Sequence, residues 1–246
     1  DRKKMSKSKG NVVTPQHLMD QYSADALRLW AAKARLGADT AFDEGLFAVG
    51  QKLVTKLFNA SKFVLLQCAG VNDLGVDDIT EALDQDYIHQ QRCLIEAVTV
   101  CFSRFDYAAA LDKIETAFWI FCDHYIELVK VRAYREVDIK KKRSALACLL
   151  LSLNLFCRLF APYLPYITEE IWSWQFQSIS ASVHLANWPN IAEYSAIVQP
   201  KESALFELAT TIMSHIRTAK SQSQKNMKHP VKELIVTGSS EDCSRL

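Results

Sequence analysis

EGLFAVGQKLVTKLFNASKFVLLQ, residues 44–67, is the longest stretch of the chain with a clear helical repeat of apolar side chains. At about 100° of rotation per residue, its apolar side chains fall on one stripe that should face a core. The stripe consists of Leu46, Leu53, Leu57, Ala60 and Val64, widened by Phe47, Val54, Phe58 and Leu65. The pattern therefore predicts one long amphipathic helix packed against others.

The opposite face of this predicted helix carries a different set of side chains. Lys52, Lys56, Asn59 and Phe63 fall within a narrow arc. Two lysines for phosphates, an amide for a base edge and a ring for stacking suit a single-stranded loop of RNA. The alternative is that Phe63 packs under a neighbouring helix. Residue types alone leave both interpretations open.

Composition favours a mainly α-helical fold. The 246 residues are 49% hydrophobic, enough for a substantial core, and only seven are glycine and six proline. Such sparse turn formers favour long helices over a sandwich of many strands. Helices are predicted over residues 15–22, 23–35, 44–67, 84–105, 107–136, 139–158, 166–176 and 202–221. The β-branched run at 231–237 predicts a strand, and hence a small α/β element at the C-terminal end.

Several helix ends have a local signal. Thr14 followed by Pro15, and Ser23 before the next apolar repeat, read as helix starts. Asp106 caps the helix at 107–136, whose centre is apolar on more than one side and should be buried. Asp123, Glu127 and Lys130 are spaced there to form ion pairs.

Charge and cysteine content limit the classes of function. The formal net charge is +1, so a polyanionic partner must be recognised by local clusters, such as the seven Lys and Arg residues from Lys130 to Arg143. Seven cysteines without a paired motif indicate a reducing cytoplasm and no disulfide framework. Cys122 and His124 diverge around a helix, so no metal site is expected. No signal peptide or membrane span is predicted.

The run Lys4-Met5-Ser6-Lys7-Ser8, followed by Lys9-Gly10, has the chemistry of a phosphate clamp. Lysines bring mobile charges, serines bring neutral donors, and glycine lets the backbone approach closely. The alternative interpretation is a solvated basic tail.

This run resembles the second signature motif of the class I aminoacyl-tRNA synthetases at all five positions, and the resemblance continues through residues 23–30. It implies that Lys4, Ser6, Lys7 and Ser8 bind ATP, with Mg in the intact enzyme. It also implies a catalytic role for Lys7, which would stabilise the pyrophosphate leaving group.

Further stretches resemble the helical anticodon-binding domain shared by the valine, isoleucine, leucine and methionine enzymes: residues 56–63, 118–130 and 160–172. Residues 35–43, 59–63 and 167–172 most resemble the valine-specific members, with the isoleucine-specific members as the alternative. The resemblance spans about residues 2–237. It implies the end of a catalytic domain at 1–40, an anticodon-binding domain at 41–190 and an extension at 191–246.

The resemblance also implies partners. They are the anticodon stem-loop of tRNA(Val), with valine and ATP in an intact enzyme that is expected to be a cytoplasmic monomer. The nucleotide-binding core of the family would lie upstream, so this chain is expected to bind RNA without catalysing aminoacylation alone. The rival interpretations are a free-standing helical RNA-binding module and a structural bundle whose basic patches serve solubility.

Overall fold

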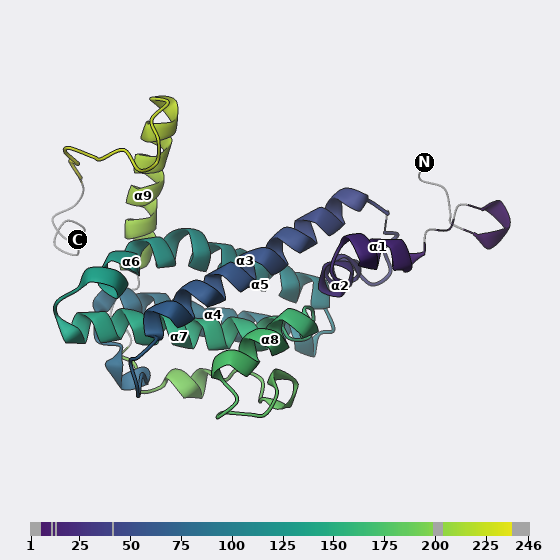
Figure 1. The fold of residues 1–246 in the computed structure, drawn as a ribbon, viewed down its shortest axis with the longest axis horizontal. Helices are drawn as coiled ribbons and strands as arrows, with labels where there is room; N and C mark the ends of the chain where they lie inside the picture. Colours follow the sequence, from purple (N-terminus) through teal and green to yellow (C-terminus); the bar gives the residue numbers. More distant parts are fainter. Residues whose placement is uncertain (1–5, 11, 13, 41, 199–203, 238–246) are drawn as a thin grey trace.

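The computed structural model describes residues 6–10, 12, 14–40, 42–198 and 204–237, and the structural statements below concern these residues. They form a bundle of long helices, with two short helices at its N-terminal end and one longer helix that projects from the other end (Figure 1). In chain order the α-helices are α1 (Pro15–Gln21), α2 (Ala24–Ala32), α3 (Glu44–Cys68), α4 (Ala82–Ser103), α5 (Tyr107–Ile120), α6 (Ile126–Arg135), α7 (Ile139–Phe160), α8 (Pro165–Gln175) and α9 (Leu205–Gln222). The mainly α-helical fold predicted from composition is confirmed.

The helix starts follow the capping signals in the sequence. Pro15 occupies the first turn of α1, and the Ser23 side chain accepts from Ala26 N at 3.2 Å at the start of α2. Asp43 caps α3 and Asp106 caps α5 in the same way. Because each cap satisfies an amide that the helix itself leaves unpaired, these ends could be located from residue type alone.

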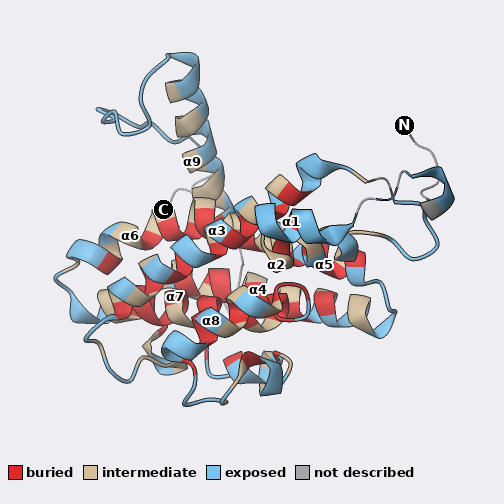
Figure 2. Cartoon of the chain, turned by 45° about the vertical axis from the view of Figure 1, so that its right-hand side comes forward, coloured by how far each residue is buried: buried red, intermediate tan, exposed pale blue. Residues whose placement is uncertain are grey.

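Helix α7 is the centre of the bundle, and α3, α4, α5, α6 and α8 all contact it. Figure 2 shows buried residues along its length and on the inward faces of its neighbours. Its length and apolar composition would suit a membrane span, but 78% of that window is buried inside the protein. A helix surrounded by protein can be apolar on every side, so α7 is a core helix.

Helix α3 packs against α2, α7 and α8. Leu53, Leu57 and Val64 are fully buried, whereas two side chains that the pattern also assigned to the core are exposed, Leu46 to 40% and Phe58 to 39%. The Phe58 ring packs edge-on against Trp174 of α8, with 5.6 Å between ring centres. The predicted apolar stripe is therefore slightly larger than the face of α3 that is buried.

The helix predicted at 107–136 is continuous over residues 107–135, but its hydrogen-bond pattern changes near the middle. A π-helical turn from Phe121 to Tyr125 separates α5 from α6. The rings of Phe121 and Tyr125 both stack on Tyr87 of α4, and the Tyr87–Tyr125 ring centres are 4.0 Å apart. The wider turn lets both rings reach the same partner, a tertiary effect that apolar periodicity does not reveal.

Helix α9 projects from the bundle, as Figure 1 shows. Phe206 is its only buried residue, and Phe206 N donates to the buried Asp86 carboxylate of α4 at 2.7 Å. The strand predicted after α9 is wrong: residues 231–237 contain no strand and are exposed. A β-branched run becomes a strand only when another strand edge satisfies its backbone groups, and no described segment offers one.

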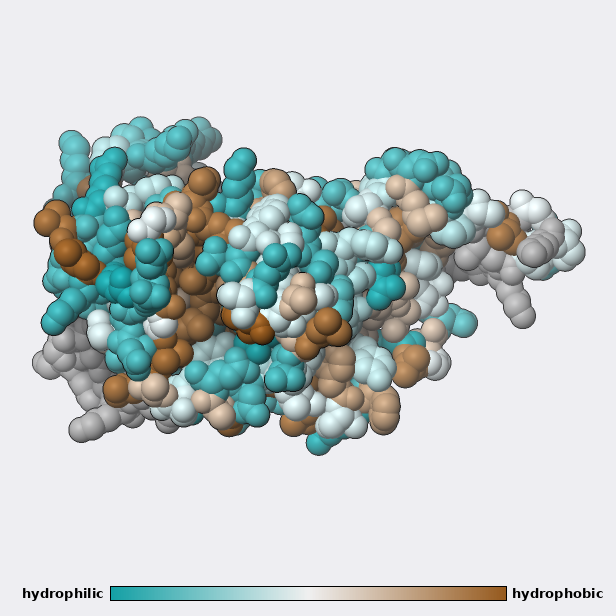
Figure 3. All heavy atoms as spheres, turned by 60° about the horizontal axis from the view of Figure 1, so that its bottom comes forward, coloured by the Kyte–Doolittle hydropathy of each residue, from teal (hydrophilic) through white to brown (hydrophobic). Residues whose placement is uncertain are grey.

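The lower face of the bundle has the mixed surface of a water-exposed protein. Figure 3 shows hydrophilic side chains over most of this face, with apolar patches scattered among them.

Candidate nucleic-acid interface

One side of the bundle, between α9 and the N-terminal helices, is formed by α3, α5 and α6 (Figure 1). Two hollows of about 610 and 520 Å³ lie there, and Lys56 lines both. Lys52, Asn59 and Trp119 line the first hollow, and Asp123, Arg217 and Lys220 line the second. We call this region the α3–α9 surface and define it by these seven residues.

Three of the four side chains predicted to bind RNA meet on this surface. Lys52 and Asn59 are exposed, and neither forms an ion pair or side-chain hydrogen bond within the described part of the chain. Lys56 differs, because its Nζ lies 2.9 Å from Asp123 Oδ1 and 5.4 Å from the centre of the Trp119 ring. The Lys56 charge is thus already held by a carboxylate and an aromatic face.

The fourth, Phe63, lies further along α3. Its half-buried ring packs against the core and meets Tyr134 of α6 edge-on, with 5.7 Å between ring centres. Tyr134 is 55% exposed. Packing against the core and Tyr134 therefore covers part of the Phe63 ring. The more exposed of these two rings is that of Tyr134.

Helix α9 closes the second hollow. Arg217 Nη2 donates to the carbonyl oxygen of Asp123 at 2.6 Å, and Lys220 Nζ donates to that of Met227 at 2.9 Å. Burial raises the pKa of Cys122 to about 12. Burial and, next, the charge of Arg217 lower the pKa of His124. The Cys122 thiol, which lines the second hollow, is therefore protonated at neutral pH and is not a thiolate nucleophile.

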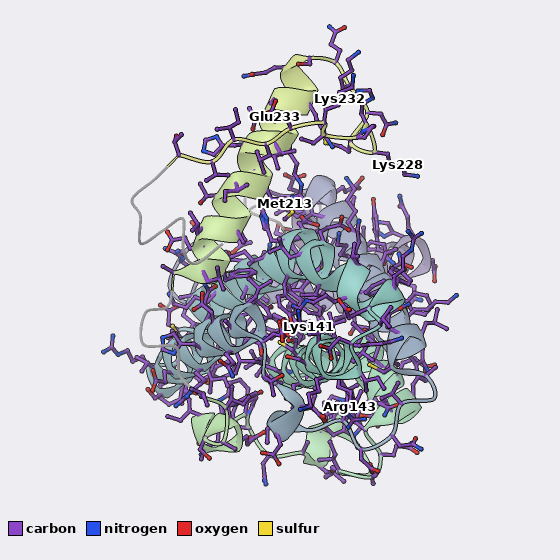
Figure 4. The ribbon with its side chains drawn as sticks, turned by 90° about the vertical axis from the view of Figure 1, so that its left-hand side faces the viewer. Lys141, Arg143, Met213, Lys228, Lys232 and Glu233 are labelled. Atoms are coloured by element: carbon purple, nitrogen blue, oxygen red, sulfur yellow. The ribbon has the colours of Figure 1, made fainter. Side chains whose placement is uncertain are left out.

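The basic stretch from Lys130 to Arg143 divides into paired and unpaired cations. Arg132 is bound to Asp84 in the core, Arg143 is bound to Asp78, and Lys130 pairs with Glu127. Arg135, Lys140 and Lys141 are exposed. In Figure 4, Lys141 lies at the end of the bundle, with Lys228 and Lys232 on the segment beside α9.

The N-terminal phosphate clamp is only partly described. Lys7–Lys9 form a single 3₁₀ turn, and the Ser6 and Ser8 hydroxyl oxygens lie 3.1 Å apart. Lys4 and the side chain of Lys7 lie outside the described residues, so their assignment to ATP stays a prediction. Within the described ranges, no three His, Cys, Asp or Glu side chains come together as metal ligands.

Residue types alone did not identify Trp119, Arg217 or Tyr134 as part of this region. Trp119 lies in the centre of the predicted 107–136 helix, which was expected to be buried, and Tyr134 lies near the end of that helix. Arg217 belongs to the predicted 202–221 helix, for which no packing partner was predicted. Their position on this surface depends on how α5, α6 and α9 pack. In the sequence, Arg217 lies between Glu207 and Glu233 in a segment that contains no other acidic residue.

Comparison with known families decides the class of the protein. Residues 84–235 match the family described as the anticodon-binding domain of tRNA ligase. The chain belongs to this family. Residues 1–43 match the class I tRNA synthetases for isoleucine, leucine, methionine and valine. The resemblance drawn from the Lys4–Ser8 run and from the helical stretches is thereby confirmed.

The similar proteins point the same way. The chain is 41% identical to a valine–tRNA ligase of Thermobifida fusca over 246 residues, covering 100% of this chain and 28% of that protein. It is 39% identical to one from a Wolbachia strain, covering 96% of this chain and 28% of that protein. It therefore spans under a third of the length of these relatives.

A solved structure shares the fold. A leucyl-tRNA synthetase from Agrobacterium radiobacter, determined as a ternary complex with tRNA and LeuAMS, superposes with a TM-score of 0.62 at 21% identity. The match covers 89% of this chain and 28% of that one.

Proposed function

We propose that this chain binds the anticodon stem-loop of tRNA(Val) as part of a valine–tRNA ligase. The observation that carries the proposal is the 41% identity to a valine–tRNA ligase over a match that covers the whole chain. The tRNA named in the leucine enzyme complex, which shares this fold, supports a tRNA partner.

The α3–α9 surface supplies the two kinds of contact that such a loop needs. Lys52 is an exposed cation that can bind a phosphate, and the exposed Asn59 amide can read a base edge. Lys56 Nζ is paired with Asp123 Oδ1 at 2.9 Å, and it can bind a phosphate of the RNA instead when the RNA displaces the carboxylate. Arg217 and Lys220 of α9 line the second hollow, so the RNA lies between the bundle and this helix.

At the other end of the chain, we assign the Lys4–Ser8 run to the ATP site of the intact enzyme. Lys4, Ser6 and Ser8 contact the phosphates, and Lys7 carries the charge that stabilises the departing pyrophosphate. Lys7→Ala in the intact enzyme should therefore depress ATP–pyrophosphate exchange far more than valine binding. Unchanged exchange in that variant would remove Lys7 from catalysis.

The RNA proposal is tested by the affinity of the chain for a valine-type anticodon stem-loop and a base-substituted loop across a salt series. If Phe63 stacks on a base, Phe63→Ala should weaken binding by about 1 to 3 kcal/mol. Lys56→Ala should weaken both loops alike and reduce the salt slope by about 1. Lys62→Ala, an exposed lysine of α3 outside the arc, is the matched control and should change neither.

The ion pair sharpens this test. Asp123→Asn removes the charge that competes for Lys56, so affinity for both loops should rise and the salt slope should steepen. If Lys62→Ala matches Lys56→Ala, or if Phe63→Ala changes nothing in a folded protein, this anticodon site is wrong. Aminoacylation of tRNA by the intact enzyme with valine and with isoleucine decides the amino acid.

A further inference from the structure

Tyr134, in the last turn of α6, presents an aromatic ring at the surface. The side chain is 55% exposed, and among the described residues its ring meets one other ring, that of Phe63, edge-on with 5.7 Å between ring centres. The Tyr134 hydroxyl forms no hydrogen bond within the described part of the chain. An edge-on neighbour covers at most one face of a ring, so the other face of Tyr134 is free to stack.

The position of this ring continues the α3–α9 surface. Lys56 of α3 and Glu127 of α6 line the second hollow. Phe63 and Tyr134 each follow seven residues later on the same two helices, which is two turns or about 10 Å, and residues at this spacing share a helix face. The ring contact joins the two helices again at this point. RNA bound over the second hollow therefore has the Tyr134 ring within reach.

Cations flank the ring. Arg135 follows it directly, and Lys140 and Lys141 lie in the first turn of α7; all three are exposed. The carboxylates of the connecting turn, Glu136 and Asp138, accept from backbone amides and form no ion pair with these cations within the described ranges. Figure 4 shows Lys141 at this end of the bundle. An exposed ring among cations matches a single strand of RNA, which presents a base and a phosphate at every nucleotide.

We propose that Tyr134 stacks on a base of the bound anticodon loop, while the half-buried Phe63 ring supports it from the side and Arg135 faces the neighbouring phosphates. The inference rests on the RNA-binding function proposed above and adds a contact to it. Stacking tolerates any base, because every base has an aromatic face, so Tyr134 contributes affinity and leaves the reading of base edges to polar groups such as Asn59.

The test is a thermodynamic cycle between the ring and the bases of the loop. Valine-type anticodon stem-loops, each with one loop nucleotide made abasic, are titrated against the full 246-residue chain. One abasic position should weaken binding to the wild type about 5- to 150-fold, the scale on which one stacked base contributes. Tyr134→Ala should bind that abasic loop and the intact loop alike, because each partner has already lost the other.

Three further variants separate stacking from packing and from charge. Tyr134→Phe keeps the ring and should keep most of the affinity. Tyr134→Leu keeps an apolar side chain against Phe63 but has no ring face, so it should lose about as much as Tyr134→Ala. None of these substitutions removes a phosphate contact, so the salt slope should stay that of wild type. Tyr166→Ala, at an exposed tyrosine of α8, is the matched control and should bind as wild type does.

Failure of this inference is distinct from failure of the proposed function. If the wild-type chain binds no stem-loop, the RNA function itself is wrong. If the wild type binds and a folded Tyr134→Ala binds equally well, the ring does not stack and its exposed face is left to another occupant, such as a second copy of the chain. Losses from Tyr134→Ala and from every abasic position that simply add would likewise overturn the stacking. Equal losses in Tyr134→Phe and Tyr134→Ala would assign the contact to the hydroxyl instead of the ring.

Discussion

Asp84→Ala is expected to destabilise the bundle by about 3 to 5 kcal/mol, because it leaves the Arg132 guanidinium in the core without a counter-charge. Asp84 is 0% exposed, and its oxygens accept from Arg132 Nη1 and Nη2 at 2.8 and 2.6 Å. They also accept from Tyr125 Oη at 2.8 Å and Ser144 Oγ at 2.7 Å. The carboxylate is therefore the common acceptor of four donors.

The geometry places the expected loss of folding free energy in Asp84→Ala toward the lower end of this range of about 3 to 5 kcal/mol. The Arg132 side chain is 17% exposed, so water can reach part of the guanidinium once the carboxylate is gone. Against this, each of the two hydroxyls loses its acceptor, at about 1 to 3 kcal/mol if it finds no other. Replacing both charges, as in Asp84→Leu with Arg132→Met, removes the unpaired ion and should cost less than Asp84→Ala alone.

Urea unfolding followed by circular dichroism measures these differences. Arg135→Met is the control, because Arg135 is exposed on the same helix as Arg132, and it should stay within about 0.5 kcal/mol of wild type. The reasoning is refuted if Asp84→Ala costs under about 1 kcal/mol, or if the single losses simply add in the double variant, since members of one network must couple.

Two further predictions concern α9 and pH. Asp86→Ala removes the acceptor of Phe206 N and should speed tryptic cleavage at Arg217 without unfolding the bundle. Asp86→Asn keeps an acceptor and should not speed this cleavage. Equal cleavage rates in the two variants would contradict the prediction. Hydrogen bonding by Arg143 lowers the pKa of Asp78 below the ordinary 3.8, so the pair stabilises the fold above that value and ceases to do so as pH falls through the lowered pKa. The melting-temperature difference between wild type and Arg143→Met should thus be full at neutral pH and vanish in strong acid, and a pH-independent difference would exclude this origin.

The bundle could be predicted because its signals are local. The stripe of α3 repeats for 25 residues, and polar caps precede α2, α3 and α5, so the starts of these helices follow from adjacent residues. The Lys4–Ser8 run and the anticodon-type stretches identified the family for the same reason. Such signals need no knowledge of what packs against them.

The errors occurred where a distant partner decides the outcome. The run at 231–237 has strand propensity but no described strand beside it. The turn at Phe121–Tyr125 depends on Tyr87, which lies in another helix. Lys56 was expected to present a free charge, yet its partner Asp123 lies 67 positions away. In each case the residue that determines the local structure lies far away in the sequence, so the neighbouring residues do not predict the outcome.

The same distinction explains how a chain with a net charge of only +1 can have a surface suited to RNA. A count of charges treats Arg132 and Arg135 alike, although Arg132 is bound to a carboxylate in the core and Arg135 is exposed. A cation that stays bound to a carboxylate in the core, as Arg132 does, neutralises no phosphate, whereas a cation that reaches a phosphate displaces counterions from the RNA and contributes to the salt dependence of affinity. Because the carboxylates of Asp84, Asp78 and Glu127 are paired with Arg132, Arg143 and Lys130, their charges largely cancel. The exposed cations near α9 and at the start of α7 therefore determine the electrostatic potential at this end of the protein. The salt slope should accordingly respond to substitution of Lys140 or Lys141 and stay unchanged when Arg143 is replaced in a folded protein.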